Sequence, residues 1–220
     1  YFCAEQEQIS MQVKHIQHKQ IDILMNYIWR QEMGKKPLSE KQIKSLRKLV
    51  DGKPLHELLL NLSVDLMLRG SDLLNLKVSD VVSENGTIKD EVKVKQKKTG
   101  KITLSMPLSK NSIASIKKHL TDRPQEDFIF RGQKAYTGKP ITIQQYARII
   151  KGWMSDLGIE DTSNFSTHSM RKTKASVIYD KTKNVDAVRR LLGQSSVTAT
   201  SAYLGVTDNS ALDLARQYSI

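Results

Sequence analysis

The sequence is poor in three features that mark particular protein classes: cysteine, aromatic residues and long apolar runs. Cys3 is the single cysteine among 220 residues, so no disulfide can form within the chain, and a reducing compartment is expected. Two tryptophans and four phenylalanines leave a core built mainly from aliphatic side chains. No apolar run approaches the roughly 20 residues that span a bilayer, and no segment resembles a signal peptide. We therefore expect a cytoplasmic protein with no membrane partner.

Acidic residues are also scarce relative to basic ones. The chain has 35 lysines and arginines against 23 acidic residues, a formal net charge of +12. Nine lysines lie between residues 89 and 118, where Asp90 and Glu91 are the only acidic residues. A positive field favours a polyanionic partner, most often nucleic acid, although a basic protein without such a partner is the alternative.

Apolar periodicity predicts a mainly α fold with one small antiparallel β-sheet, an α+β class. The segments "EVKVKQ" and "KITLSM" alternate apolar and polar residues on either side of "KKTGK", which predicts a two-stranded hairpin with a glycine turn. Ser39, Ser71 and Asn184 are expected helix N-caps, and a buried helix should end near Gly70. Helical spacing marks residues 4–33, 39–50, 55–70, 72–76, 109–120, 140–157, 168–180, 185–192, 197–204 and 208–217.

Two familiar ligand motifs can be set aside. The segment "GQKAYTGK" (132–139) has one residue too many between its glycines for a phosphate loop, and Pro140 stands where Ser or Thr should follow. His15 and His18 share a helical face, but no further ligands accompany them, so a solvated helix is the better interpretation. The sequence therefore predicts no metal site.

The segment "THSMRKTKAS" (167–176) carries the first chemically informative pair. His168 and Arg171 are three residues apart, so on a helix both can reach one phosphate. The segment "LLGQ" follows, ending at Gln194, which is 23 residues after Arg171; Tyr203 comes nine residues later. Each of these motifs is weak when taken alone.

Three upstream residues complete the pattern. In "LMLRGSDLL", Arg69 lies at an expected helix end and Asp72 follows three residues later. Lys98 lies in the turn of the lysine-rich hairpin, directly before Thr99 and Gly100. An arginine, a hairpin lysine, H-x-x-R, an LLGQ element and a tyrosine therefore occur in that order.

From about residue 38 to 210 this order and spacing resemble the tyrosine recombinase (phage integrase) family. The resemblance implies a recombinase-like catalytic domain (37–220) that cleaves and rejoins double-stranded DNA through a covalent 3′-phosphotyrosyl link, with no cofactor. It also implies a homotetramer on synapsed sites, a monomer or weak dimer without DNA, and a bacterial or phage-like, nucleoid-associated setting. Residues 1–36 would be a helical segment or the remnant of a DNA-clamping domain, and residues 206–220 would dock onto a neighbouring subunit.

The residue types suit that chemistry. Arg69 and Arg171 would hold the non-bridging oxygens with forked, permanently charged donors, and His168 would donate to them or accept the phenol proton. A phenol with a pKa near 10 is ionised to about one part in a thousand at pH 7, a handicap of roughly 4 kcal/mol. Lys98 would protonate the leaving 5′ oxygen as general acid.

Each proposed role has an alternative, either a structural role for the same residue or a competing residue of the same type. Arg69 could be a helix-terminal cation, and Asp72 is expected to support Arg69 or the fold rather than to perform chemistry. Tyr203 could be a core aromatic, and Tyr179 and Tyr218 are competing phenols that lack the spacing from "LLGQ". Lys95, Lys97 and Lys101 compete with Lys98. The expected DNA contacts are Lys93, Lys95, Lys97, Lys101, Lys172 and Lys174.

Gln194 departs from the family, which usually has histidine there and less often tryptophan. An amide can donate to a phosphate oxygen but cannot exchange a proton near neutral pH. The sequence therefore predicts an active enzyme with a donor-only residue at 194. A type IB topoisomerase, or a DNA-binding regulator with weakened catalysis, remains the alternative.

Overall fold

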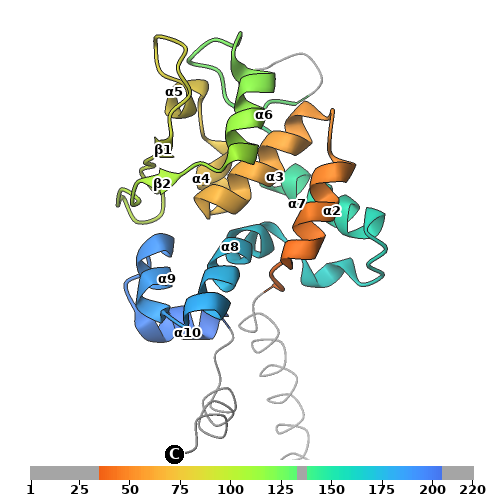
Figure 1. Cartoon of the computed structure of the whole chain (residues 1–220), viewed down its shortest axis with the longest axis vertical. Helices are drawn as coiled ribbons and strands as arrows, with labels where there is room; N and C mark the ends of the chain where they lie inside the picture. The colour runs from red at the N-terminus through yellow and green to blue at the C-terminus, as the bar shows by residue number, and fades with distance from the viewer. Residues whose placement is uncertain (1–34, 133–137, 205–220) are drawn as a thin grey trace, which may run out of the picture. The chain divides into compact units, whose positions relative to one another are not determined.

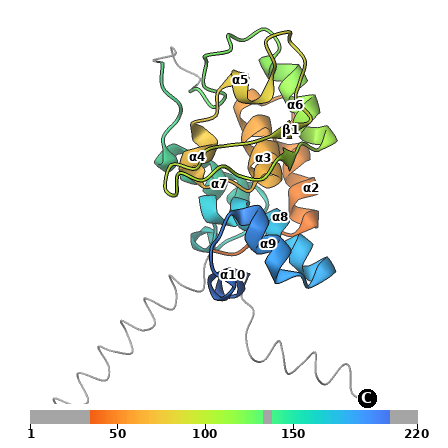
Figure 2. The same cartoon turned by 90° about the vertical axis from the view of Figure 1, so that its left-hand side faces the viewer.

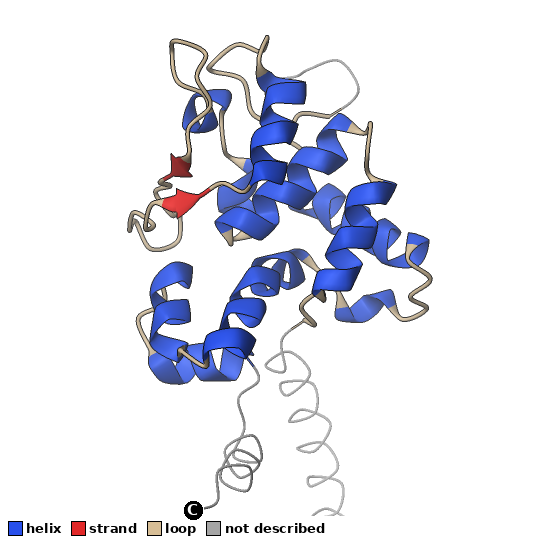
Figure 3. Ribbon diagram, in the orientation of Figure 1, coloured by secondary structure: helices blue, strands red, loops and turns tan. Residues whose placement is uncertain are grey.

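The computed structural model describes residues 35–132 and 138–204, and within them it confirms a mainly helical fold with a two-stranded antiparallel sheet (Figure 3). The expected helices at 4–33 and 208–217 lie outside the described residues. None of the described helices is long and apolar enough to cross a membrane. The elements are α2 (Glu40–Leu49), α3 (Pro54–Leu66), α4 (Gly70–Leu74), α5 (Val78–Val81), β1 (Glu91–Val92), β2 (Met106–Pro107), α6 (Lys110–Leu120), α7 (Ile143–Asp156), a 3₁₀ turn (Thr162–Asn164), α8 (Thr167–Thr182), α9 (Val185–Leu192) and α10 (Val197–Leu204).

Helix α3 is the centre of the hydrophobic core. Every residue from Glu57 to Leu66 is buried, as the nearly continuous apolar run predicts for a helix surrounded by protein. It packs against α6 and α8, while α8 in turn contacts α9 and α10 (Figure 1). Because α8 carries His168 and Arg171 and leads into α9 and α10, the core connects directly to the residues of interest.

Capping side chains set several helix ends as predicted. The Ser39 hydroxyl accepts from the backbone N–H of Gln42, whose side chain accepts from the Ser39 backbone N–H in return, a capping box. Asn184 caps α9 with a single bond, in which its side chain accepts from the backbone N–H of Ala187. Gly193 ends α9 at φ +64°, which only glycine adopts without strain.

The predicted end of α3 is wrong by one turn. Met67 adopts a left-handed conformation (φ +48°), which stops α3 at Leu66 although the apolar pattern continues. Gly70 therefore begins α4 instead of ending α3, and Arg69, not Ser71, is the N-cap residue. Met67 is buried, and no local sequence signal indicates its left-handed conformation.

The predicted lysine hairpin is present but has shorter strands than expected. Glu91 pairs with Pro107 and Val92 with Met106, whereas Lys95 pairs with Ile102. The register changes by one residue between these pairs, so the second strand holds one extra residue, a bulge that interrupts the ladder. The turned view follows the hairpin past α3 and α4 (Figure 2), and β2 packs against α3.

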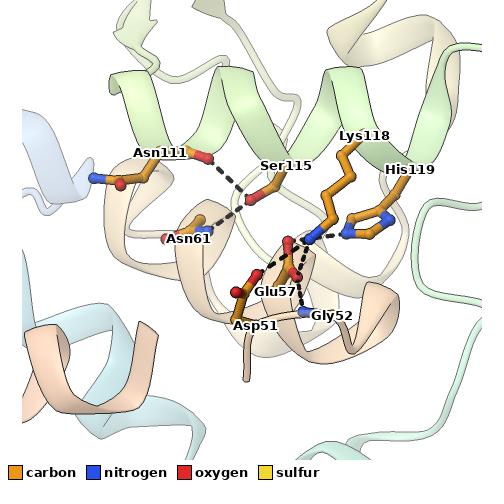
Figure 4. A network of polar contacts seen from close by, with 8 residues as sticks. All are labelled: Asp51, Gly52, Glu57, Asn61, Asn111, Ser115, Lys118 and His119. Carbon is orange, nitrogen blue, oxygen red and sulfur yellow. Dashed lines mark hydrogen bonds and ion pairs between the residues drawn. The ribbon is translucent and has the colours of Figure 1, made fainter. Parts of the chain in front are cut away.

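A polar network ties the turn after α2 to helix α6 (Figure 4). The buried carboxylate of Glu57 accepts from the Gly52 backbone N–H at 2.5 Å and from the Lys118 ammonium at 3.0 Å, and its other oxygen lies 2.9 Å from His119 Nε2. Burial raises the pKa of Glu57, but these donors outweigh it, so the net pKa lies below the ordinary 4.5. The network therefore stabilises the fold when Glu57 is ionised.

Replacing Glu57 with glutamine should lower the free energy of unfolding by about 2 kcal/mol at pH 7, because a buried charge-assisted network is broken. A lowered carboxylate pKa stabilises above the unfolded value, so this difference should shrink as the pH falls below 4.5. Urea unfolding at pH 7 and pH 4 measures both effects. Glu40→Gln, which breaks the exposed pair with Lys181, is the control and should leave the free energy of unfolding nearly unchanged, because solvent screens a surface pair; equal losses in the two variants would contradict the expectation.

Candidate active site

Arg69 lies in the short connection between α3 and α4, and its side chain forms one side of the site. As N-cap of α4 it has an extended backbone conformation (φ −62°, ψ +147°). Its Nη1 donates to Gln96 Oε1 at 2.6 Å and lies 4.0 Å from Asp72 Oδ2. The guanidinium is therefore held by the hairpin on one side and by its own helix on the other.

Arg171 reaches the same place from inside α8. It is only 4% exposed, and its Nη2 donates to the Leu192 carbonyl at the end of α9, at 2.6 Å. Burial lowers its pKa, and the charge of Arg69 lowers it further, which shows that the two guanidiniums are neighbours. Within the described structure Nη1 of Arg171 is buried without a hydrogen-bond partner. A buried guanidinium with a free donor is suited to an oxyanion.

His168 lies one turn before Arg171 on α8. Although the residue is exposed, the protein around its ring lowers its pKa below 6.5. The positive charges of Arg171, Lys172 and Arg69 lower it further. The imidazole is therefore neutral at pH 7 and keeps one nitrogen able to accept a proton.

Tyr203 on α10 completes the group. Burial raises the pKa of its hydroxyl to about 12, although the charge of Arg171, a hydrogen-bonding interaction with the same guanidinium and the charge of Arg69 act to lower it. The hydroxyl is buried close to the Arg171 guanidinium, but it forms no hydrogen bond of good geometry with any described residue. We refer to Arg69, His168, Arg171 and Tyr203 as the arginine–tyrosine cluster, because the charges of both arginines act on His168 and on Tyr203.

Lys172 supports the ring of Tyr203 from α8. Its ammonium lies 4.6 Å from the ring centroid, a cation–π contact, and the residue is only 5% exposed. Burial lowers its pKa. Lys172 is therefore packed against a ring in the described structure, and the contact with DNA expected from the sequence stays a prediction.

The lysine turn (residues 96–101) is closed by hydrogen bonds between Gln96 N–H and Lys101 O and between Gly100 N–H and Gln96 O. The Lys97 backbone N–H donates to Oδ1 of the buried Asp72 at 2.9 Å, so Asp72 anchors the turn beside Arg69. Lys98 projects from this turn as an exposed side chain. In the part of the chain that the structure describes, Lys98 makes no hydrogen bond or ion pair, so it is near the cluster without being fixed to it.

Gln194 follows the Gly193 bend between α9 and α10. Its side-chain amide lies 2.7 Å from the hydroxyl of the buried Thr200, and the same hydroxyl lies 2.9 Å from the Ser196 carbonyl. A hydroxyl carries one hydrogen, so it donates to one of these two oxygens at a time. The role of Gln194 as a phosphate donor stays a prediction.

Comparison with known proteins bears on this geometry. The sequence profile of the phage integrase family matches residues 36–210. The chain belongs to the phage integrase family. The probable integrase/recombinase YoeC of Bacillus subtilis is 30% identical over 142 residues, which cover 64% of this chain and 72% of YoeC. Tyrosine recombinase XerH of Campylobacter jejuni is 24% identical over 162 residues, 74% of this chain but only 44% of XerH.

Solved structures of recombinases share the fold of this integrase-family chain. XerA recombinase superposes with a TM-score of 0.67 at 18% identity, covering 85% of this chain and 66% of XerA. A XerH recombinase bound to a palindromic difH substrate in a post-cleavage complex gives 0.63 at 21% identity, covering 84% and 53%. At such identities the likeness concerns the fold.

Apart from Lys172, the lysines expected to contact DNA in this integrase-family domain fall into two groups, one partly buried and one exposed. Lys174 is half-buried on α8 and forms an ion pair with Asp65, 3.6 Å away, so like Lys172 it is occupied within the fold. The four others are exposed along the hairpin: Lys93, Lys95, Lys97 and Lys101. The hairpin therefore presents the free positive charge.

Sequence reasoning missed residues whose role depends on packing. Gln96 and Thr200 contact site residues, yet neither belongs to a recognisable motif. Leu192 lies within the LLGQ element, but the role of its backbone carbonyl as the acceptor for Arg171 could not be read from the sequence. The competing phenol Tyr179 packs against the core, with the ammonium of Lys183 5.1 Å from its ring centroid, and Tyr218 lies outside the described residues. No group of three metal-binding side chains occurs among the described residues.

Proposed function

We propose that residues 37–220 are the catalytic domain of a site-specific DNA recombinase that cleaves and rejoins strands through a 3′-phosphotyrosyl intermediate. One observation carries the proposal: Tyr203 presents an unpartnered hydroxyl next to two guanidiniums, one of which has an unpartnered donor of its own. A scissile phosphate would satisfy both. Residues 1–36 would be an adjoining helical segment or part of a DNA-clamping domain.

The cleavage step exchanges one phosphate ester for another. Arg69 and Arg171 bind the non-bridging oxygens, Tyr203 Oη forms a bond to phosphorus, and the bond to the 5′ oxygen breaks. Neutral His168 accepts the phenol proton, and Lys98 gives a proton to the departing 5′ oxygen. Rejoining is the same step in reverse, so no metal and no nucleotide is consumed.

Activation of the phenol is the most demanding part of this step. With a pKa of about 12, Tyr203 is ionised to about one part in 10⁵ at pH 7, a handicap of about 7 kcal/mol. This is larger than the value expected for an unperturbed tyrosine. Proton transfer to His168 during the attack avoids forming a free phenolate, and the arginines stabilise the charge that passes to the phosphate.

Gln194 is proposed to donate its amide N–H to the phosphate. Gln194→Ala should then slow single-turnover strand cleavage by about 10²-fold, the usual cost of one preorganised donor. Gln194→His restores a donor and should stay within about 10-fold of the wild type, since the loss of the Thr200 bond costs less than the loss of the donor. Unchanged cleavage in the alanine variant together with no cleavage in the histidine variant would reject this role.

The partner is proposed to be duplex DNA, gripped first through phosphates by the lysine hairpin. Phosphate contacts position a duplex without specifying its sequence. A homotetramer would assemble on two synapsed sites, with a monomer or weak dimer in the absence of DNA. Residues 206–220, outside the described residues, are proposed to dock onto a neighbouring subunit, and the setting would be the nucleoid of a bacterial or phage-infected cell.

A suicide substrate tests the proposal. A duplex nicked just 3′ to the scissile phosphate loses a short fragment on cleavage, so the covalent complex accumulates as an SDS-resistant band with a free 5′ hydroxyl released. Substrates drawn from the DNA flanking the gene supply candidate sites. No adduct on any of them, with DNA binding retained, would favour a DNA-binding regulator. Relaxation of plasmids lacking a specific site would favour the type IB topoisomerase alternative.

A further inference from the structure

Gln96 contacts several segments beside the arginine–tyrosine cluster, although it has no part in the chemistry described above. It is only 2% exposed, which is unusual for glutamine on a surface hairpin. Its Oε1 accepts from Arg69 Nη1 at 2.6 Å and from the Thr99 hydroxyl at 3.0 Å. One amide oxygen thus joins the cluster to the lysine turn.

The other end of the amide contacts the bend before α10. A Cβ placed on Gly193 would lie 2.8 Å from Gln96 Nε2, closer than real contacts allow, so the amide packs on the bare glycine backbone. Gly193 directly precedes Gln194 and the helix that carries Tyr203. Gln96 therefore touches three segments: the start of α4, the lysine turn and the end of α9.

The backbone of the same residue closes the turn. Gln96 N–H donates to Lys101 O at 2.9 Å, and Gln96 O accepts from Gly100 N–H at 2.8 Å. Lys98 lies between these anchor points and makes no polar contact of its own within the described residues. The turn consequently sets the backbone position from which the Lys98 side chain extends, and the turn is itself held by Gln96 and by Asp72 through Lys97.

We propose that Gln96 is a positioning residue that locks the Lys98 turn onto Arg69 and the Gly193 bend, so that the general acid is aligned only while the phosphate-binding arginine is in place. The inference rests on the proposed function, because it assigns Lys98 to the leaving oxygen. Gln96 itself touches neither DNA nor the reacting atoms. Its loss should therefore impair proton donation to the leaving group more than it impairs phosphate binding.

A change of leaving group separates these effects. In a suicide substrate whose bridging 5′ oxygen is replaced by sulfur, the departing thiolate needs no proton, so the contribution of the general acid disappears. Gln96→Met keeps the length of the side chain and removes its hydrogen bonds. We expect it to slow cleavage of the oxygen substrate by about 100-fold and of the sulfur substrate by about 10-fold or less. Lys98→Met should show the same preference for sulfur.

Two further variants keep the test decisive if Gln96→Met is poorly folded. Thr99→Val removes the second donor to Oε1 from an exposed turn, and should give a smaller loss with the same recovery on sulfur. Gln144→Met, an exposed position on α7, is the matched control and should leave both rates unchanged. Equal losses on both substrates, or no loss, in Gln96→Met and Thr99→Val would overturn the inference. A wild-type chain that forms no adduct on either substrate would overturn the proposed function as well.

Discussion

Tyr203→Phe should abolish the covalent protein–DNA adduct and leave the fold at least as stable as the wild type. The hydroxyl is the proposed nucleophile, so no phosphotyrosyl bond can form without it. In the described structure it is buried without a partner, and such a group costs about 1–3 kcal/mol of desolvation. Removing it therefore sacrifices only the weak interaction with the Arg171 guanidinium. Gel analysis of the suicide substrate and thermal unfolding measure the two outcomes.

The matched control is Tyr179→Phe, which changes the phenol that packs against the core on the same helix as Arg171. It should retain the adduct and bind DNA as the wild type does. If Tyr203→Phe still formed an SDS-resistant adduct, another nucleophile would be responsible. Peptide mapping of the adduct would then identify it.

Arg171→Lys should reduce strand cleavage by about 10²- to 10³-fold even though the charge is kept. The guanidinium binds the Leu192 carbonyl with Nη2 and leaves Nη1 for the phosphate, a division that one ammonium group cannot reproduce. Lysine in this buried position also loses its proton more readily than arginine does. Single-turnover cleavage with saturating protein measures the effect separately from DNA affinity.

Arg190→Lys is the control for this exchange. Arg190 lies on the exposed side of α9, where its side chain pairs with Asp186 at 2.8 Å, so either cation serves there. We expect cleavage within about twofold of the wild type, as for surface substitutions in general. A similar loss in both variants would show that Arg171 has no special part in the site.

Much of the fold follows from local sequence signals. The caps at Ser39 and Asn184 and the glycine at 193 set helix ends because their chemistry is local. The end of α3 could not be predicted in the same way, since Met67 takes a left-handed conformation that no local signal indicates. The hairpin bulge likewise leaves no signal in the alternation of apolar and polar residues within the strands.

The site likewise contains residues that the sequence pattern predicted and residues whose roles only packing reveals. The resemblance to the recombinase family, carried by the order and spacing of the motifs, pointed to the four residues of the arginine–tyrosine cluster. A helix places His168 and Arg171 on one face, and the short α9–α10 unit returns Tyr203 to them. Spacing could not show that Lys172 faces inward while the hairpin lysines face outward, since the two kinds look identical in the sequence. The role of Gln96 could not be predicted for a related reason. It depends on contacts among three segments that come together only after folding.

The cluster also has a consequence for work in solution. Two guanidiniums and the Lys172 ammonium share a small region in which Asp72 is the close carboxylate, so the excess positive charge awaits a counter-ion. Small multivalent anions would compete with the nucleic acid there in a way that chloride does not. Buffers containing sulfate, phosphate or heparin would thus depress measured activity at unchanged ionic strength, and storage in them would protect the chain against heat.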